Sequence, residues 1–468
     1  MSRQVLYKPS LYDFLSCDKC KTVSSVIGTL VVKMPHRTNT NADLPYIEPP
    51  SQEGLRAIKL PPPYTGTPSK IFISDIKLFF KNFFYLPYLF IPLYPWHSGA
   101  LCELYPSREN LTDIALHVIL FITQLGFLVS LFTLTFLPTF TYIAYIALYF
   151  ALNELVCWHF NRGIPRSGLK STEDALSQSW PRHDDEAWIF LNGICVGKNW
   201  FQKNIDRISR TFHRPVIGVH NRTAGVVFDL IQCLIQRALL YATQDVRECY
   251  VLVKNALLDE QKKKVIFILH SQGGIEGGMI IDWLLDEMPF DKLQKLEVYT
   301  FGNIANHFSN PCRGNDPSTP VIPHIEHYVN EKDFACRFGV LNFTRHYTQN
   351  ENRFAGKVFI NRSGGHQLNQ NYLDDMFPLD KTLRMARDAK QGDFMDRKVR
   401  VRKDGTIKET TRAELPSGFT VTWDSGARNG FIATDEVPKM GDLSRLWKYR
   451  NGQLPDSYKS ALVDGIEH

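Results

Sequence analysis

The sequence predicts an α/β protein with a mostly parallel sheet covered by helices, preceded by a membrane-embedded helical segment. Two observations carry this prediction. From about residue 184, short apolar runs alternate with segments of helical periodicity, and forty uncharged residues lie between Asp113 and Glu154. Strands that alternate with helices are typical of a parallel sheet covered on both faces. An uncharged apolar run of that length is typical of a membrane segment.

Six apolar runs are predicted strands, and four segments between them are predicted helices. Near-continuous apolar strands are what a sheet buried on both faces requires. Apolar residues at helical spacing indicate helices that pack on that sheet. The predicted strands are residues 187–193, 214–221, 263–271, 295–303, 324–330 and 357–362. The predicted helices are residues 199–212, 228–243, 244–258 and 273–288.

The chain divides into four zones by composition. Residues 1–70 are rich in Pro, Ser, Thr and Asn and are expected to be irregular. Residues 71–155 form an aromatic and membrane-embedded zone, and residues 184–380 form the α/β domain. Residues 381–468 are a basic, polar extension that is expected to be a small β-rich appendage or partly irregular.

Composition and cysteine usage exclude several classes of function. The net charge of +6 is modest for 468 residues, and no compact basic face interleaved with aromatics suggests nucleic-acid binding. The nine cysteines are scattered, which argues against a disulfide framework and for a reducing compartment. Cys17 and Cys20 form one C-x-x-C without a second ligand pair, so we expect no metal there.

An aromatic run from Ile71 to Trp96 precedes the uncharged segment. Pro87, Pro92 and Pro95 forbid one long straight helix across it. Aromatic residues edged by lysines suit the headgroup region of a membrane, where Tyr and Trp place one end in water and one in lipid. A buried packing segment is the alternative interpretation.

The uncharged run is predicted to enter the membrane, because it shows no polar face at the helical period. Forty helical residues reach about 60 Å, which is two hydrocarbon thicknesses of about 30 Å with nothing left for a turn. Pro138 leaves 24 residues before it and 15 after it. One span with a shallower arm and a hairpin that enters and leaves by the same face both remain open. Arg162, Arg166 and Lys170 follow the run and place that flank in the cytosol.

A predicted strand runs into His270-Ser271-Gln272-Gly273-Gly274 and then into a predicted helix. Such a tight turn needs small residues around the serine, and the helix N-terminus favours negative charge there. This stretch resembles the G-x-S-x-G nucleophile elbow of the α/β-hydrolase family, in its lipase-like form. Leu269 stands where that family usually has glycine. The resemblance covers roughly residues 184–380 and makes Ser271 the expected nucleophile of a catalytic domain.

The resemblance also implies an acid and a histidine, in that order along the chain. Asp333, in the turn after residues 324–330, matches the acid, with Glu331 and Glu326 as alternatives. His366 follows the last predicted strand between glycines and a helix-like segment, and it matches the histidine. His346 and His324 are the alternatives to His366, and His270 is expected to pack or shape the pocket.

The oxyanion hole is expected to use backbone N–H groups from two places. Gln272 follows the nucleophile and supplies one of them. The loop after an early strand supplies the other, and Asn192-Gly193-Ile194 stands where relatives often carry His-Gly-x. By that resemblance Gly193 or Ile194 joins Gln272. A simple strand-ending turn is the alternative interpretation of this loop.

The resulting hypothesis is a membrane-attached serine ester hydrolase whose catalytic domain faces the cytosol. An acyl lipid is the expected substrate, because a membrane-bound domain meets lipids at high local concentration. The chemistry calls for no metal or cofactor. A lipid acyltransferase is a variant, and the Leu269 departure keeps a non-catalytic membrane scaffold open. The endoplasmic reticulum and a lipid-droplet surface fit equally well.

Overall fold

A computed structural model describes residues 46–48, 66–172, 182–311, 320–345, 354–403, 406–410 and 437–455. All of these residues belong to one compact unit, Pro45–His468, to which the description below refers.

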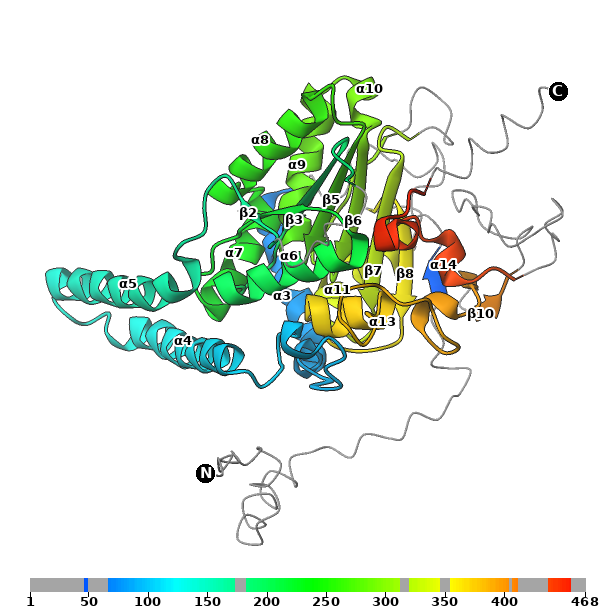
Figure 1. Cartoon of the computed structure of the whole chain (residues 1–468). Helices are drawn as coiled ribbons and strands as arrows, with labels where there is room; N and C mark the ends of the chain where they lie inside the picture. Colours follow the sequence, from blue (N-terminus) through cyan, green and yellow to red (C-terminus); the bar gives the residue numbers. More distant parts are fainter. Residues whose placement is uncertain are drawn as a thin grey trace, which may run out of the picture. The chain divides into compact units, whose positions relative to one another are not determined.

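A ten-stranded mixed sheet forms the centre of this unit (Figure 1). Its strand order is β10-β9-β1-β8-β7-β6-β5-β3-β4-β2, and the six strands from β8 to β4 are all parallel. The parallel strands are β3 (Glu186–Leu191), β4 (Val216–Val219), β5 (Lys264–His270), β6 (Leu296–Phe301), β7 (His324–Asn330) and β8 (Lys357–Asn361). The outer strands are β1 (Tyr46–Glu48), β2 (Leu169–Lys170), β9 (Arg400–Lys403) and β10 (Thr406–Glu409).

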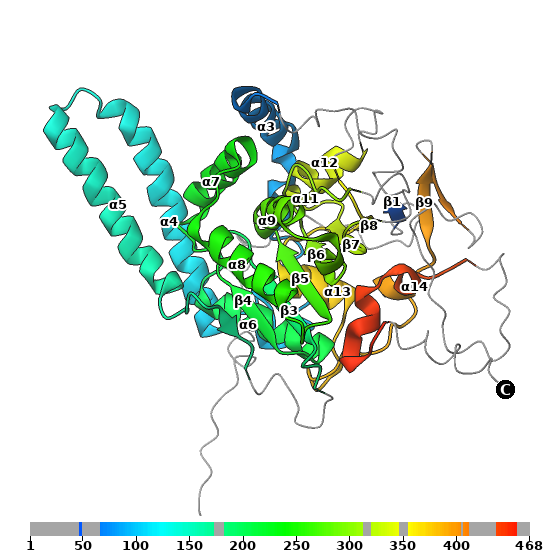
Figure 2. The ribbon, with the colours of Figure 1, turned by 90° about the horizontal axis from the view of Figure 1, so that it is seen from above.

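Helices cover both faces of the parallel strands (Figure 2). Helix α6 (Lys198–Phe212) packs Phe201 and Ile205 directly over Gly218 of β4. Helices α8 (Gln244–Leu258) and α9 (Gly273–Glu287) cover the other face, and α7 (Val226–Leu239) packs beside α9. The parallel strands are therefore buried on both sides, which explains their near-continuous apolar sequences.

The shorter helices lie around the ends of the sheet. They are η5 (Gly99–Leu101), α10 (Phe290–Leu293), α11 (Phe334–Phe338), α12 (Val340–Arg345), the π-helix η7 (Leu368–Leu373), α13 (Asp374–Met376), η8 (Phe394–Asp396), α14 (Met440–Leu443) and η10 (Leu446–Gly452).

The α/β class, the six predicted strands and the four predicted helices are confirmed, with shifts of at most four residues at their ends. The sheet nevertheless extends beyond the predicted 184–380 domain in both directions. Strand β1 comes from the zone that was expected to be irregular, and it pairs with β8 and β9. Three-residue strands carry too weak a periodic signal to be found before their partners are known.

Described parts of the C-terminal extension pack into the core. Leu446 and Tyr449 of η10 are fully buried. Arg214, itself fully buried, pairs with Glu186 of β3 (Nε to Oε2, 2.9 Å) and donates to Tyr449 O. A buried guanidinium needs several acceptors, and η10 supplies one of them. The C-terminal segment thereby closes over the end of α6 and β3.

The aromatic run forms helix α3 (Pro68–Asn82), helix η4 (Phe83–Leu89) and an extended stretch after them. Pro87 lies inside η4, and no long helix crosses the prolines, as predicted. Asp75 of α3 is buried and forms a bidentate ion pair with Arg237 of α7. Phe84 is 84% exposed. One side of the run is therefore packed and the other open. The buried-segment interpretation fits the packed side, and the headgroup-region interpretation fits the open side.

Helices α4 (Arg108–Thr133) and α5 (Thr139–Asn161) form an antiparallel pair that breaks at Pro138 (Figures 1 and 2). Both are long and apolar enough to cross a membrane. The expectation that this run has no polar face is wrong for α4, in which His117 and Gln124 are buried on one side. Two polar residues among many apolar ones are too few to show a face by sequence periodicity.

Candidate active site

The predicted nucleophile lies in a sharp turn between strand β5 and helix α9. Ser271 has φ 57°, a left-handed conformation that is uncommon for a residue with a side chain. Its N–H donates to Phe301 O of the neighbouring strand β6 (3.0 Å), and its carbonyl accepts from Gly274 N–H (2.9 Å). Gly273 is required here, because a Cβ would collide with Leu191 O at the end of β3. The turn is thus held from the strand side and from the helix side.

The three residues predicted to act together lie within hydrogen-bonding distance. His366 Nε2 is 2.8 Å from Ser271 Oγ, and His366 Nδ1 is 2.8 Å from Asp333 Oδ2. Ser271 follows β5, Asp333 follows β7 and His366 follows β8, so all three occupy the carboxyl edge of the parallel sheet. They are 3%, 0% and 8% exposed in that order.

Asp333 accepts from Ala335 N–H, from Tyr372 OH and, at 3.6 Å, from Cys336 Sγ. Its Oδ1 accepts from Ala335 N–H (2.9 Å), since Asp333 is the N-cap of α11. Its Oδ2 accepts from Tyr372 OH (2.6 Å) in addition to His366. Burial and the nearby Asp333 carboxylate raise the pKa of Tyr372 well above its usual value, so the phenol stays a donor. Sequence reasoning missed Tyr372, which no local motif marks.

His270 is bonded to the backbone of the neighbouring histidine. Its Nε2–H donates to His366 O (2.8 Å), and the two rings lie 4.8 Å apart. Burial, with the nearby His366, lowers the pKa of His270 to about 3. His270 therefore remains neutral at ordinary pH and adds no charge beside Ser271, in line with the packing role expected for it.

Leu269, which stands where the hydrolase pattern has glycine, packs against a glycine of helix α9. Leu269 is fully buried, and its side chain lies over Gly277, one turn into α9. A Cβ on Gly277 would lie 2.7 Å from Leu269 Cδ2 and closer still to Cδ1. The bulk at position 269 is thus accommodated by the missing side chain at position 277.

The predicted oxyanion donors converge beside Ser271. The Gly193 backbone is so close that a Cβ there would overlap Ser271 Cβ and lie 3.0 Å from Oγ. Among the hydrogen bonds of the described residues, none uses the N–H of Gln272, Gly193 or Ile194. Free N–H groups next to a nucleophile are what an oxyanion needs.

A network of buried amides holds the two donor segments together. Asn192 Oδ1 accepts from Asn221 N–H (2.9 Å), and Asn221 Nδ2 donates to Gln272 Oε1 (2.6 Å). Gln272 Nε2 donates to Gln236 Oε1 (2.8 Å), and Gln236 donates to Glu276. Burial raises the pKa of Glu276 well above its usual value. The ends of β3, β4 and β5 are thereby linked through three amide side chains and the backbone N–H of Asn221.

The alternative candidates lie elsewhere. Glu331 pairs with Arg362 (3.0 Å), and Glu326 accepts from Arg445 N–H and Leu446 N–H. His324 begins β7, at the opposite end of that strand from Asp333. His346 lies outside the described residues, as do Cys17 and Cys20.

The aromatic segment is bonded to the histidine loop. Gly365 N–H donates to Tyr88 O (2.9 Å) and His366 N–H donates to Leu89 O (3.2 Å). A Cβ on Gly364 would lie 2.8 Å from the Tyr88 ring. The η4 segment and the loop that carries His366 therefore belong to one packed structure.

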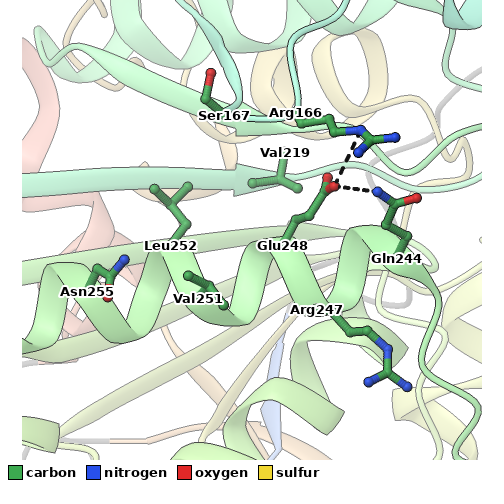
Figure 3. Close-up of a pocket in the computed structure, with 9 residues that line it drawn as sticks. All are labelled: Arg166, Ser167, Val219, Gln244, Arg247, Glu248, Val251, Leu252 and Asn255. Atoms are coloured by element: carbon green, nitrogen blue, oxygen red, sulfur yellow. Dashed lines mark hydrogen bonds and ion pairs between the residues drawn. The ribbon is translucent and has the colours of Figure 1, made fainter.

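A surface pocket of about 550 Å³ lies between α8 and the segment before β2 (Figure 3). Glu248 in this pocket pairs with Arg166 and accepts from Gln244 Nε2 (2.7 Å). The pocket is lined by Arg166, Ser167, Val219, Gln244, Arg247, Glu248, Val251, Leu252 and Asn255. It contains none of the predicted site residues, and a surface ion pair accounts for Arg166 and Glu248.

The described part of the chain contains no group of His, Cys, Asp and Glu side chains that could hold a metal ion. Its six cysteines, Cys102, Cys157, Cys195, Cys233, Cys249 and Cys336, are all free. Comparison of the chain with protein-family models, with curated proteins and with solved structures gave no match.

Proposed function

We propose that the chain is a membrane-attached serine hydrolase of the α/β-hydrolase type that cleaves an ester bond of an acyl lipid. The observation that carries the proposal is the hydrogen-bonded series Ser271–His366–Asp333, with 2.8 Å at each step. Nucleophile, base and orienting acid within such distances are the signature of an activated serine.

In this mechanism Ser271 Oγ attacks the ester carbonyl while His366 Nε2 takes its proton. Asp333 holds the imidazole in the required tautomer and stabilises the imidazolium. The N–H groups of Gln272 and of Gly193 or Ile194 bind the oxyanion of the tetrahedral intermediate. The intermediate then expels the alcohol, which receives the proton from His366. Water repeats the sequence on the acyl-enzyme and releases the fatty acid.

The topology supports the hydrolase part of the proposal. The nucleophile, acid and histidine follow β5, β7 and β8, in the chain order of the α/β-hydrolase family. The left-handed Ser271 and the adjoining Gly273 suit a nucleophile elbow. Leu269 stands where the family usually has glycine, and this departure kept the scaffold alternative open. Because its side chain fits over Gly277, the leucine is no argument against the elbow.

The surroundings of the site support a lipid substrate. Phe84 (84% exposed) and Phe90 (53% exposed) flank the carbonyls that bind the His366 loop. Exposed aromatics of this kind favour the membrane interface. An acyl lipid held there would lie against the segment that is hydrogen-bonded to the His366 loop. The basic flank Arg162, Arg166 and Lys170 supports a domain on the cytosolic side.

The test is hydrolysis of glycerolipids and phospholipids by the full chain in mixed micelles. The wild type should release fatty acid, and Ser271→Ala should lose this activity. Ser167→Ala, in the pocket of Figure 3, is the matched serine control and should keep it. Equal release by Ser271→Ala and wild type would reject the proposal.

A further inference from the structure

Helix α4 carries a polar stripe on the side that faces the protein. Its buried residues recur every three or four positions, which marks one face of a helix. The rest of its circumference is apolar and open, as Ile122 (63% exposed) and Val129 (65% exposed) show. This is the reverse of a soluble surface helix, and it suits a helix with protein on one side and lipid on the other. The buried residues are Asn110, Asp113, His117, Leu120, Gln124 and Phe127.

Amide side chains of α4 and α5 are hydrogen-bonded to the domain at one position along the hairpin, the level of Gln124 and Asn153. Gln124 Nε2 donates to Ala224 O (2.7 Å) and to Asn153 Oδ1 (2.9 Å). Asn153 Nδ2 donates to the same Ala224 carbonyl (3.0 Å). Gly225 leaves room for this junction, because a Cβ there would overlap the Gln124 amide. Side-chain hydrogen bonds therefore tie α4 to the domain as far as Gln124, and the Phe127 ring, one turn further on, contacts Phe228 of α7.

Exposed charges mark the same level from outside. Arg222 and Glu154 lie 3.8 Å apart, and their side chains are 64% and 66% exposed. Exposed charges are costly in hydrocarbon, so this level belongs to headgroups or water. One turn further from the tip, the Arg162 guanidinium lies 4.6 Å from the ring centre of the exposed Trp158. A cation beside an amphipathic ring suits the headgroup region.

Beyond this level the pair is short and apolar. The 13 residues that follow Gln124, up to Leu137, reach about 20 Å at about 1.5 Å per residue. The hydrocarbon core of a bilayer is about 30 Å thick, whereas one leaflet with its headgroups is about 20–22 Å thick. The turn itself, Leu134–Pro138, contains no charged residue, and Phe136 in it is 95% exposed. Such a turn is suited to hydrocarbon rather than to water beyond the far headgroups.

We infer that α4 and α5 form a hairpin that enters and leaves a single leaflet of a phospholipid membrane, with its turn inside the hydrocarbon. Both flanks and the whole domain then lie on one side of the membrane. Helix α7 lies between α3 and α4 (Figure 2), so the aromatics of α3 and η4 share that side. This inference rests on the membrane attachment in the proposed function, but not on turnover.

Site-resolved thiol labelling tests the hairpin. The Phe136→Cys variant is reconstituted in phosphatidylcholine–phosphatidylserine vesicles and treated with a membrane-impermeant maleimide. The reagent is added outside the vesicles only, both outside and inside them, or after the vesicles have been dissolved in detergent. Peptide mass spectrometry reads position 136 alone, so native cysteines do not interfere. Phe290→Cys, at an exposed phenylalanine of α10, is the matched control and should react from outside throughout.

In the Phe136→Cys variant, the thiol at position 136 should react about ten-fold less in intact vesicles than in detergent, with reagent on either side, because a thiol in hydrocarbon does not ionise. Labelling that needs only internal reagent would show a full crossing and overturn the inference. Labelling from outside without detergent would show a turn in water and overturn it as well. The Ser271→Ala background gives the same readout, so failure of the hydrolase proposal and failure of the hairpin are separable.

Discussion

The contact between Leu269 and Gly277 predicts a strong coupling between the two positions. The side chain of Leu269 occupies the volume that a methyl group on residue 277 would need. In Gly277→Ala, overpacking should cost about 1–3 kcal/mol, offset by about 1 kcal/mol of improved helix propensity. Leu269→Ala alone should cost about 2–5 kcal/mol, since it leaves a cavity under a fully buried side chain.

The double variant should be more stable than the sum of the two changes predicts. With Leu269 shortened, the methyl group at 277 no longer collides and partly fills the cavity. A coupling of about 1–3 kcal/mol in favour of the double variant follows. Gly278→Ala is the matched control, because a Cβ there meets its nearest atom at an ordinary 3.5 Å. It should show no coupling to Leu269→Ala.

The assay is denaturant unfolding of the six detergent-solubilised proteins (wild type, three single variants and two double variants), with the rate of fluorophosphonate labelling measured for each. If the two changes add to within about 0.5 kcal/mol, Leu269 does not depend on Gly277. The explanation of the glycine departure would then be refuted, even if every variant kept its labelling.

Three further predictions concern the site and the core. Tyr372→Phe removes a donor to the triad carboxylate and should lower kcat about ten-fold at unchanged KM in steady-state lipid hydrolysis; an unchanged kcat would contradict its positioning role. Arg237→Met leaves the buried Asp75 carboxylate unpaired and should cost about 3–5 kcal/mol in denaturant unfolding, whereas the exposed-pair variant Lys263→Gln should cost less than about 1 kcal/mol; equal costs would contradict the burial argument. Burial lowers the pKa of His327 to about 4, so below about pH 6.5 the unfolded histidine binds a proton that the folded one does not. As the pH is lowered from about 6 to about 4.5, the free energy of unfolding of the wild type should therefore decrease by about 1.4 kcal/mol per pH unit relative to that of His327→Gln. Parallel curves of unfolding free energy against pH for the two proteins would contradict this assignment.

Much of the fold and the site could be predicted because their signals are local. Each parallel strand is a short apolar run, and the strand before Ser271 and the glycines after it indicate a tight turn at this serine. Asp333 and His366 follow strands whose carboxyl ends meet at one edge, so their positions along the chain already imply proximity. The geometry brings these three together without requiring any of the alternatives.

The features that sequence reasoning missed depend on contacts between distant segments. Tyr372 reaches Asp333 only because the π-helix after His366 turns back over α11. Strand β1 is recognisable only once β8 and β9 stand on either side of it. Within the uncharged run, the covered side of α4 carries only two buried polar residues, His117 and Gln124, so burial and not sequence periodicity identifies that side.

The measurement that tests the central claim most directly is fluorophosphonate labelling of the detergent-solubilised protein, since the probe reacts only with an activated serine. Wild type should be labelled, Ser271→Ala should not, and Ser167→Ala should be labelled like the wild type. Absence of labelling in a folded wild type, or labelling that survives Ser271→Ala, would contradict an activated nucleophile at Ser271 and favour a membrane scaffold instead.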